Sequence, residues 1–225
     1  SRTEQTGVAL ITLDSSAENS IVVCPGANGT VDSDEILAAL EALPVLKMIM
    51  LQLEIPMDCV ERTVAYAAQR GIPVFLDPAP VPPEGLPEEL YAKLTYIAPN
   101  SIEAELLTGI HVCDTASARA AAQFFLARGV KNAVIKLGSH GVYAANEQGE
   151  QLIPPYHVDA IDTTAAGDTF GGAFCARISG GSSLEDALHF ANAAGAFSTT
   201  RAGAQPAMPS LEEINLFLQE KGDVR

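Results

Sequence analysis

Short β-type runs alternate with helical patterns through the middle of this 225-residue chain, and this alternation limits the possible folds more than any other feature. Proline and glycine mark most of the boundaries, since proline fits the first turn of a helix and glycine fits its end. The pattern predicts strands near residues 48–53, 73–76, 95–98 and 133–137, with helices over 56–71, 100–109 and 115–128 between them. Strands joined by helical connections pair in parallel. The sequence therefore predicts an α/β fold in which helices cover a parallel sheet.

The two ends of the chain depart from this alternation. Two β-type runs near residues 7–12 and 19–23, with a turn at 14–17, predict a hairpin that stands apart from the main sheet as a flap or lid. A helix over 33–43 follows, and Asp32 and Glu35 resemble a capping box at its start. Past residue 141, we expect β segments at 142–145 and 151–160 and helices over 166–179, 183–200 and 210–219. We therefore divide the chain into a partial β lid at 1–29 and an α/β domain at 30–225.

The composition excludes several classes of function. The net charge of −15, with only 13 Lys and Arg residues, argues against nucleic acid as a partner, because that partner requires a basic face. No apolar run has the length of a membrane span, and the first residues contain no apolar region of a signal peptide. The four cysteines form no Cys-x-x-Cys pair, so we expect free, mostly buried thiols and a cytoplasmic location. No Gly-x-Gly-x-x-Gly follows the first strand, which disfavours a dinucleotide-dependent oxidoreductase.

The strongest candidate site is the segment from Asp162 to Phe170. A β segment ends near Ile161 and a helix begins near Ala166, with small residues at its first turn. Small residues let a phosphate approach the free backbone N–H groups there, and the helix dipole favours its negative charge. Asp168 in that turn is placed to accept a proton from a hydroxyl that attacks the γ-phosphoryl group. An ordinary helix start with an aspartate that offsets the dipole explains the same residues.

At this point the sequence resembles the ribokinase (pfkB) carbohydrate kinase family. Asp162–Phe170 is similar to the family's C-terminal signature, in which glycine usually stands where this chain has Ala165. Further segments resemble the family in the same order along nearly the whole chain: residues 6–11, 18–20, 25–28, 51–56, 77–80, 99–105, 136–141 and 200–206. The resemblance implies a ribokinase-like, Rossmann-type sandwich, with a mostly parallel sheet, helices on both faces and part of a small β lid. It also implies a homodimer formed through that lid.

The resemblance also implies a reaction and assigns residues to it. The reaction is ATP-dependent phosphorylation of a sugar primary hydroxyl, with ribose giving ribose 5-phosphate as the favoured case. Asp168 becomes the general base and a sugar contact, Glu54 a second sugar contact, and Ala165, Ala166 and Gly167 the anion hole. The implied nucleotide contacts are Asn100, Lys136, Gly138, Ser139, His140, Gly141, Gly167 and Asn192. Lys136 stands where ribokinases often have threonine.

Two metal ions are implied in the same way. Glu103 organises Mg²⁺ through water, although Asn100 and Glu103 are also an ordinary helix cap with an acid in the first turn. A K⁺ site is implied at six positions, most of them through backbone carbonyls: Asp162, Thr164, Ser198, Arg201, Gly203 and Ala207.

The resemblance begins at the lid strands, so about 80–90 residues at the start of a family member have no counterpart in this sequence. They include an aspartate and a glycine-rich segment that bind the sugar. We therefore expect an uncovered sheet edge and fewer sugar contacts. The alternative hypothesis is a truncated, non-catalytic relative that binds nucleotide or serves as an interaction module.

Overall fold

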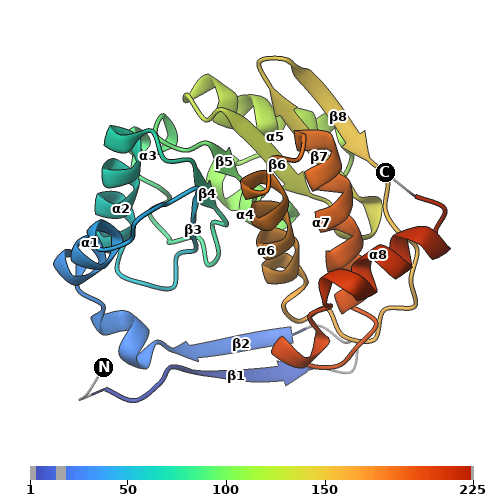
Figure 1. Ribbon diagram of the computed structural model, residues 1–225, viewed down its shortest axis with the longest axis horizontal. Coiled ribbons are helices and arrows are strands. Elements are labelled where there is room, and N and C mark those ends of the chain that lie inside the picture. Colours follow the sequence, from blue (N-terminus) through green and yellow to red (C-terminus); the bar gives the residue numbers. More distant parts are fainter. Residues whose placement is uncertain (1–3, 14–18, 224–225) are drawn as a thin grey trace.

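In the computed structural model, which describes residues 4–13 and 19–223, one central sheet carries helices on both faces (Figure 1). The strands lie side by side in chain order, as β3 (Ile49–Leu51), β4 (Val74–Leu76), β5 (Tyr96–Ile97), β6 (Asn132–Lys136), β7 (Val142–Asn146) and β8 (Gly149–Ile153). The first four are parallel, and β7 and β8 add antiparallel pairings. The predicted α/β sandwich is confirmed. No described strand pairs with the outer edge of β3, as expected.

The first face of the sheet is covered by the helices that lie between the strands. These are α2 (Met57–Arg70), α3 (Glu88–Tyr91), α4 (Ser101–Thr108) and α5 (Thr115–Ala127). Val74 and Leu76 of β4 point into this core, while Phe75 points to the other face, because side chains alternate along a strand. All three are fully buried, and a buried side chain of this size contributes about 1.5–3 kcal/mol. The strand is hydrophobic throughout because both of its faces are covered.

The second face is covered by the C-terminal helices α6 (Ala166–Ser179) and α7 (Leu184–Ser198), and α8 (Leu211–Glu220) packs on α7 (Figure 1). The ring of Phe174 lies 5.4 Å from that of Phe75. A Cβ on Gly171 would come within 2.6 Å of Met50 Cε and 3.2 Å of the Phe75 ring. Gly171 therefore lets α6 approach the sheet closely, which sets its first turn at the carboxyl ends of the strands.

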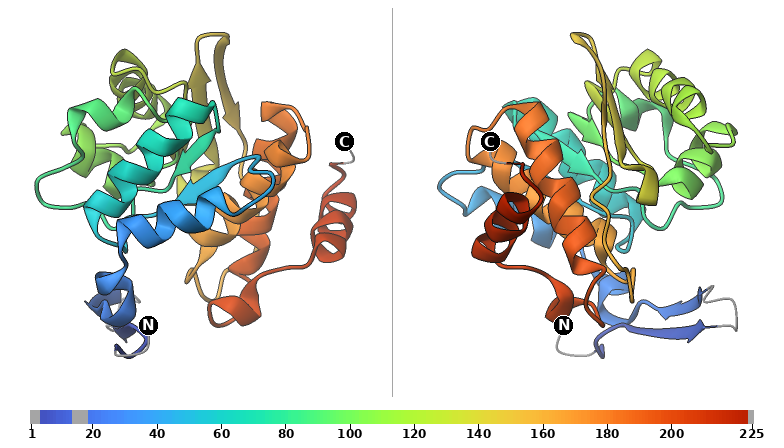
Figure 2. Two further views of the ribbon diagram at one scale, coloured as in Figure 1. Left: turned by 60° about the vertical axis from the view of Figure 1, so that its left-hand side comes forward. Right: turned by 90° about the vertical axis from the view of Figure 1, so that its right-hand side faces the viewer.

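The N-terminal hairpin lies apart from the main sheet and joins it through α1 (Ser33–Glu41), as Figures 1 and 2 show. Strands β1 (Val8–Leu13) and β2 (Asn19–Cys24) pair antiparallel, with Leu10 opposite Val22. Both of these side chains are 62% exposed. The predicted hairpin is confirmed, while its turn at 14–17 lies outside the described residues.

Two further sequence predictions need correction. The β segment predicted at 151–160 ends at Ile153, because Pro154 and Pro155 lack the N–H groups that a strand ladder needs. The cysteines are free as expected but not mostly buried, since Cys24 and Cys113 are exposed. In the part of the chain that the structure describes, no helix combines the length and hydrophobicity needed to cross a bilayer.

Helix α6 begins from an unusual backbone. Ala165, its N-cap, has φ 58° and ψ 16° in the left-handed region, and it is the only residue other than glycine with positive φ among those described. In the family's signature glycine usually stands at this position. The left-handed geometry of Ala165 accounts for that preference, because it favours glycine and is strained for alanine.

We predict that Ala165→Gly stabilises the protein by about 1 kcal/mol, since glycine adopts this geometry without a Cβ clash. For a chain of this size that gain raises the midpoint of thermal unfolding by roughly 2–4 °C. The matched control is Ala176→Gly, an exposed position inside the same helix, which should lower stability by about 0.5–1 kcal/mol. Equal effects of the two substitutions would contradict the strain at Ala165.

A second prediction concerns the ion pair between Arg201 Nη2 and Glu213 Oε1, at 2.5 Å. The bond from Arg201, together with one from the Ser210 amide, lowers the pKa of Glu213 from 4.5 to about 2. A depressed carboxyl pKa stabilises the fold above the unfolded pKa, and that stability is lost as pH falls toward the folded value. Glu213→Gln should therefore be less stable than the parent at pH 6, with the difference shrinking by pH 3. Urea unfolding measures this, with the exposed Glu84→Gln as a control that shows no such convergence.

Candidate active site

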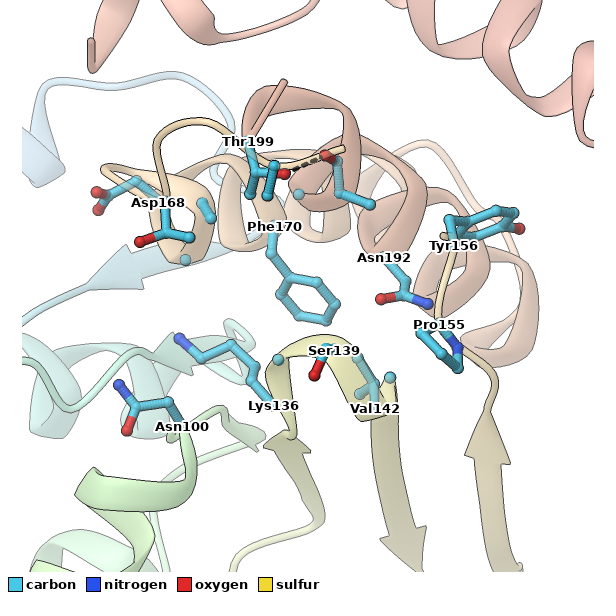
Figure 3. Close-up of a pocket in the computed structure, with 18 of the residues that line it drawn as sticks. Asn100, Lys136, Ser139, Val142, Pro155, Tyr156, Asp168, Phe170, Asn192 and Thr199 are labelled. Carbon is cyan, nitrogen blue, oxygen red and sulfur yellow. Dashed lines mark hydrogen bonds between the residues drawn. The ribbon is translucent and has the colours of Figure 1, made fainter. Parts of the chain in front are cut away.

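A cavity of about 500 Å³ opens where the carboxyl ends of β3, β4 and β6 meet the first turn of α6 (Figure 3). Ligands bind at this edge in open α/β sheets. One end of the cavity is polar and contains Asp168, Lys136 and Asn100; the other is largely apolar (Figure 3). Segments distant in the sequence therefore build one elongated site.

The first turn of α6 presents free backbone donors to the polar end. The Ala166 N–H already donates to Thr163 O at 3.2 Å, and the first bond into the helix runs from Thr169 N–H to Ala165 O at 2.9 Å. The amides of Gly167 and Asp168 lie between these two and make no backbone hydrogen bond within the described chain. Both residues line the cavity at the positive end of the helix dipole, a place that suits an anion.

Asp168 is oriented by Gln52, which follows β3. The Gln52 side-chain amide donates to Asp168 Oδ1 at 2.5 Å. Both residues line the cavity, as does Glu54 nearby on the same segment. The carboxylate of Asp168 thus lies beside the free amides but faces polar side chains from the edge of the sheet.

A buried ion pair lies next to this turn. Lys136 Nζ donates to Asp77 Oδ2 at 2.6 Å, and the two side chains are 12% and 4% exposed. A Cβ on Gly167 would lie 3.3 Å from Lys136 Nζ, so the ammonium packs directly against the first turn of α6. Burial raises the pKa of the Asp77 carboxyl, and Lys136 opposes that shift.

Asn100 and Glu103 form a complete capping box at the start of α4 and also line the cavity. Glu103 Oε1 accepts from the Asn100 side chain, through Nδ2, at 2.7 Å. Glu103 Oε2 accepts from the Asn100 backbone N–H at 2.8 Å. Burial raises the pKa of Glu103, and Lys136 lowers it. The structural and the functional interpretations of this pair are therefore compatible.

The glycine loop after β6 forms another wall. A Cβ on Gly141 would lie 2.1 Å from Ile153 O, and φ is 91° there, so the turn requires glycine. Gly138, Ser139 and Gly141 line the cavity. His140 is exposed and does not belong to the lining.

The apolar end of the cavity suits a flat ring. Phe170 projects into the middle of the cavity, and Val142, Pro155 and Tyr156 lie beyond it, near Asn192 (Figure 3). Asn192 donates to Pro154 O at 2.8 Å, so this side chain also fixes the loop that replaces the expected strand.

The six positions of the implied K⁺ site lie behind the cavity wall rather than in it. Asp162 accepts from the Thr164 amide at 2.9 Å and from the Gly203 amide at 2.7 Å. The Thr164 side chain lowers the pKa of Asp162 most, and these two amides lower it further. Asp162 thus joins the segments 162–164 and 199–203. The Arg201 side chain turns to Glu213. Ser198 Oγ donates to Gly195 O and the Ala207 amide donates to Ala204 O, so both bonds stay within their own turns. Within residues 4–13 and 19–223, no three acidic, histidine or cysteine side chains cluster as metal ligands.

Several residues of this site had no role in the sequence predictions. Gln52 and Asp77 lie in quoted family segments and directly follow β3 and β4, so the rule that ligands bind at the carboxyl ends of strands could have found them. Phe170 ends the candidate segment but was given no role of its own. The other residues of the apolar end gave no local signal: Val142, Pro155 and Tyr156.

Comparisons with known proteins agree with this geometry. The family described as pfkB family carbohydrate kinase matches residues 1–211. The ribokinase of Staphylococcus aureus (strain COL) is 40% identical over 212 residues, which are 94% of this chain and 69% of that protein. The ribokinase structure from Thermotoga maritima is 38% identical with a TM-score of 0.83 and covers 96% of this chain and 70% of its own. Arabidopsis thaliana ribokinase complexed with ribose and ATP is 29% identical, also with a TM-score of 0.83, over 96% and 70% of the two chains. The chain therefore belongs to the pfkB family of carbohydrate kinases.

Proposed function

We propose that this chain phosphorylates the primary hydroxyl of ribose with ATP and releases ribose 5-phosphate and ADP. The observation that carries this proposal is Asp168 beside the free amides of the first turn of α6, at the polar end of an elongated cavity. Ribose is the favoured sugar because the relatives include ribokinases, one of them in complex with ribose and ATP.

In this proposal ATP lies along the cavity. The adenine occupies the apolar end against Val142 and Pro155, near Asn192, and the phosphates run past the glycine loop toward α6. The Gly167 and Asp168 amides and Lys136 then surround the γ-phosphoryl group. Because phosphoryl transfer depends on positioning and charge stabilisation, these fixed donors account for much of the catalysis.

The chemical step needs one proton acceptor. The carboxylate of Asp168 takes the proton from the sugar hydroxyl while that oxygen forms a bond to the γ-phosphorus. The bond between this phosphorus and the bridging oxygen breaks, and ADP leaves with the electron pair. Gln52 keeps Asp168 oriented through its 2.5 Å hydrogen bond, and Glu54 provides a further polar group for the sugar.

The residues present also fit the implied metal ions. Asn100 and Glu103 offer oxygens at the cavity wall, where Glu103 would hold Mg²⁺ through water, and this ion would offset the phosphate charge. For K⁺, the carbonyls of Thr164 and Gly203 accept no backbone hydrogen bond within the described chain, so they are available as ligands.

We predict that Asp168→Asn lowers kcat for ribose phosphorylation by about 10²–10⁴-fold, because the amide cannot accept the proton. A coupled assay of ADP release measures this with ribose, 2-deoxyribose and fructose as acceptors. Calorimetry with ATP and Mg²⁺ should show that the variant still binds nucleotide.

The matched control is Asp58→Asn, which removes the first-turn aspartate of α2 and therefore changes a helix dipole in the same way. This control should retain parental kcat. Full activity of Asp168→Asn would exclude it as the base. ATP binding without turnover of any sugar in the parent would support the non-catalytic alternative.

We also propose that two copies of the chain associate through the β1–β2 hairpin. A two-stranded sheet alone is marginal in water, and this one exposes Val8, Leu10, Val22 and Val23, each more than half accessible. Val8, Leu10 and Val22 share one face of the hairpin, so a second hairpin that packs on this face would bury these three side chains.

Leu10→Lys combined with Val22→Lys should convert a dimer into a monomer, because the paired lysines would place like charges within the interface. Sedimentation velocity at micromolar concentration measures this change. Leu211→Lys on α8, where the leucine is also 62% exposed, is the control and should stay dimeric. A monomeric parent would refute the proposal.

A further inference from the structure

The buried aspartate at the end of β4 has no role in the site so far described. Asp77 is 3% exposed, yet it lies in the lining of the cavity at the centre of the sheet edge. Its Oδ2 accepts from Lys136, while Oδ1 has no hydrogen-bond partner among the described residues. Burying an ionised group is costly, and such a group stays charged only when it is paired. The buried carboxylate of Asp77 therefore calls for a structural or functional explanation.

The first part of the explanation is the position of the Lys136 ammonium. A lysine has four rotatable bonds and a compact ammonium, so by itself it does not hold one position. Here the side chain leaves the end of β6. Its Nζ is held by Oδ2 of Asp77 at 2.6 Å, and Asp77 follows β4, which lies beyond β5 in the sheet. Figure 3 shows the Lys136 chain extending along the cavity floor toward Asp168 and the start of α6.

The second part of the explanation is the contact between this ion pair and the start of α6. A Cβ on Gly167 would lie 3.3 Å from Lys136 Nζ and 3.8 Å from Asp77 Oδ2, so the ion pair fills the space beside this glycine. The ammonium is therefore fixed next to the amide of Gly167, where the free donors of the helix also point. Asp77, Glu103 and Asp168 together make the surroundings acidic. Among the described residues that line the cavity, Lys136 is the one lysine or arginine side chain that can offset an incoming phosphate.

We propose that Asp77 is a positioning residue for phosphoryl transfer, whose buried carboxylate fixes the Lys136 ammonium against Gly167 as a charged member of the anion hole. The inference rests on the proposed location of the transferred phosphoryl group at the first turn of α6. Asp77 itself does not touch substrate and acts through Lys136.

The test compares Asp77→Asn, Lys136→Met and the double variant with the parent. The probe is MgADP with and without aluminium fluoride, which mimics the phosphoryl group during transfer, and calorimetry measures both affinities. We expect each single variant to lose about 10²-fold of the affinity that aluminium fluoride adds, as for removal of one donor from an oxyanion hole. Affinity for MgADP alone should change less than about threefold, because the loss is confined to the charge that develops in transfer.

The double variant separates positioning from a structural role. Asp77→Asn alone leaves a buried ammonium without its partner and lowers thermal stability, whereas removing both charges should restore it. If Asp77 acts through Lys136, the double variant binds the aluminium fluoride complex no worse than Lys136→Met, so the two losses do not add. Lys131→Met, at the opposite end of β6, is the control for loss of a lysine and should bind like the parent.

Four results would overturn the proposal. The first is parental affinity of Asp77→Asn for MgADP with aluminium fluoride. The second is parental affinity of the double variant for the same complex, and the third is a loss in the double variant that equals the sum of the two single losses. The fourth is a parent whose affinity does not rise when aluminium fluoride is added. Since this binding test needs no sugar, its failure is distinct from failure of the proposed function, which the turnover assay reports.

Discussion

The close packing of α6 on the sheet determines where every proposed reacting group lies. Gly171 lets Met50 and Phe75 approach the helix, and Phe174 locks against the same ring. This contact fixes the helix axis, so that its first turn faces the carboxyl ends of β3, β4 and β6. The free amides, the Asp168 carboxylate and the Lys136 ammonium then converge on one end of the cavity. A looser helix would move the amides and the Asp168 carboxylate away from Lys136, which belongs to β6.

The same packing explains how an acidic protein can attract a phosphate. The net charge of −15 opposes any anion at long range. Inside the cavity, however, two amides at a helix N-terminus and one ammonium act at short range and in partial burial, where charges are screened less than at the surface. The favourable groups are few, so their positions matter more than their number. The residues that orient these groups, Gln52 for Asp168 and Asp77 for Lys136, are therefore important for binding the phosphate.

Local signals in the sequence were sufficient for much of the fold. Asp32, Asn100, Gly71 and Gly109 cap or end helices as their residue types predict. The pairs that shape the site could not be read in this way. Lys136 and Asp77 are 59 positions apart, and Gln52 and Asp168 are 116 apart. The strand order brings the first pair together, and the packing of α6 on the sheet brings the second pair together.

The errors also have local physical causes. The strand predicted at 151–160 stops at Ile153 because of the two prolines at 154–155, and Pro155 in the loop that follows lines the apolar end of the cavity. The replacement of glycine by Ala165 gave no sign of the left-handed dihedrals that the structure has there.

We infer above all that the transferred phosphoryl group lies at the first turn of α6. A crystal structure with MgADP, aluminium fluoride and ribose tests it most directly. The account predicts the fluoride group within hydrogen-bond distance of the Gly167 and Asp168 amides and of Lys136 Nζ, with the sugar hydroxyl at Asp168. A fluoride group bound away from this turn would contradict it.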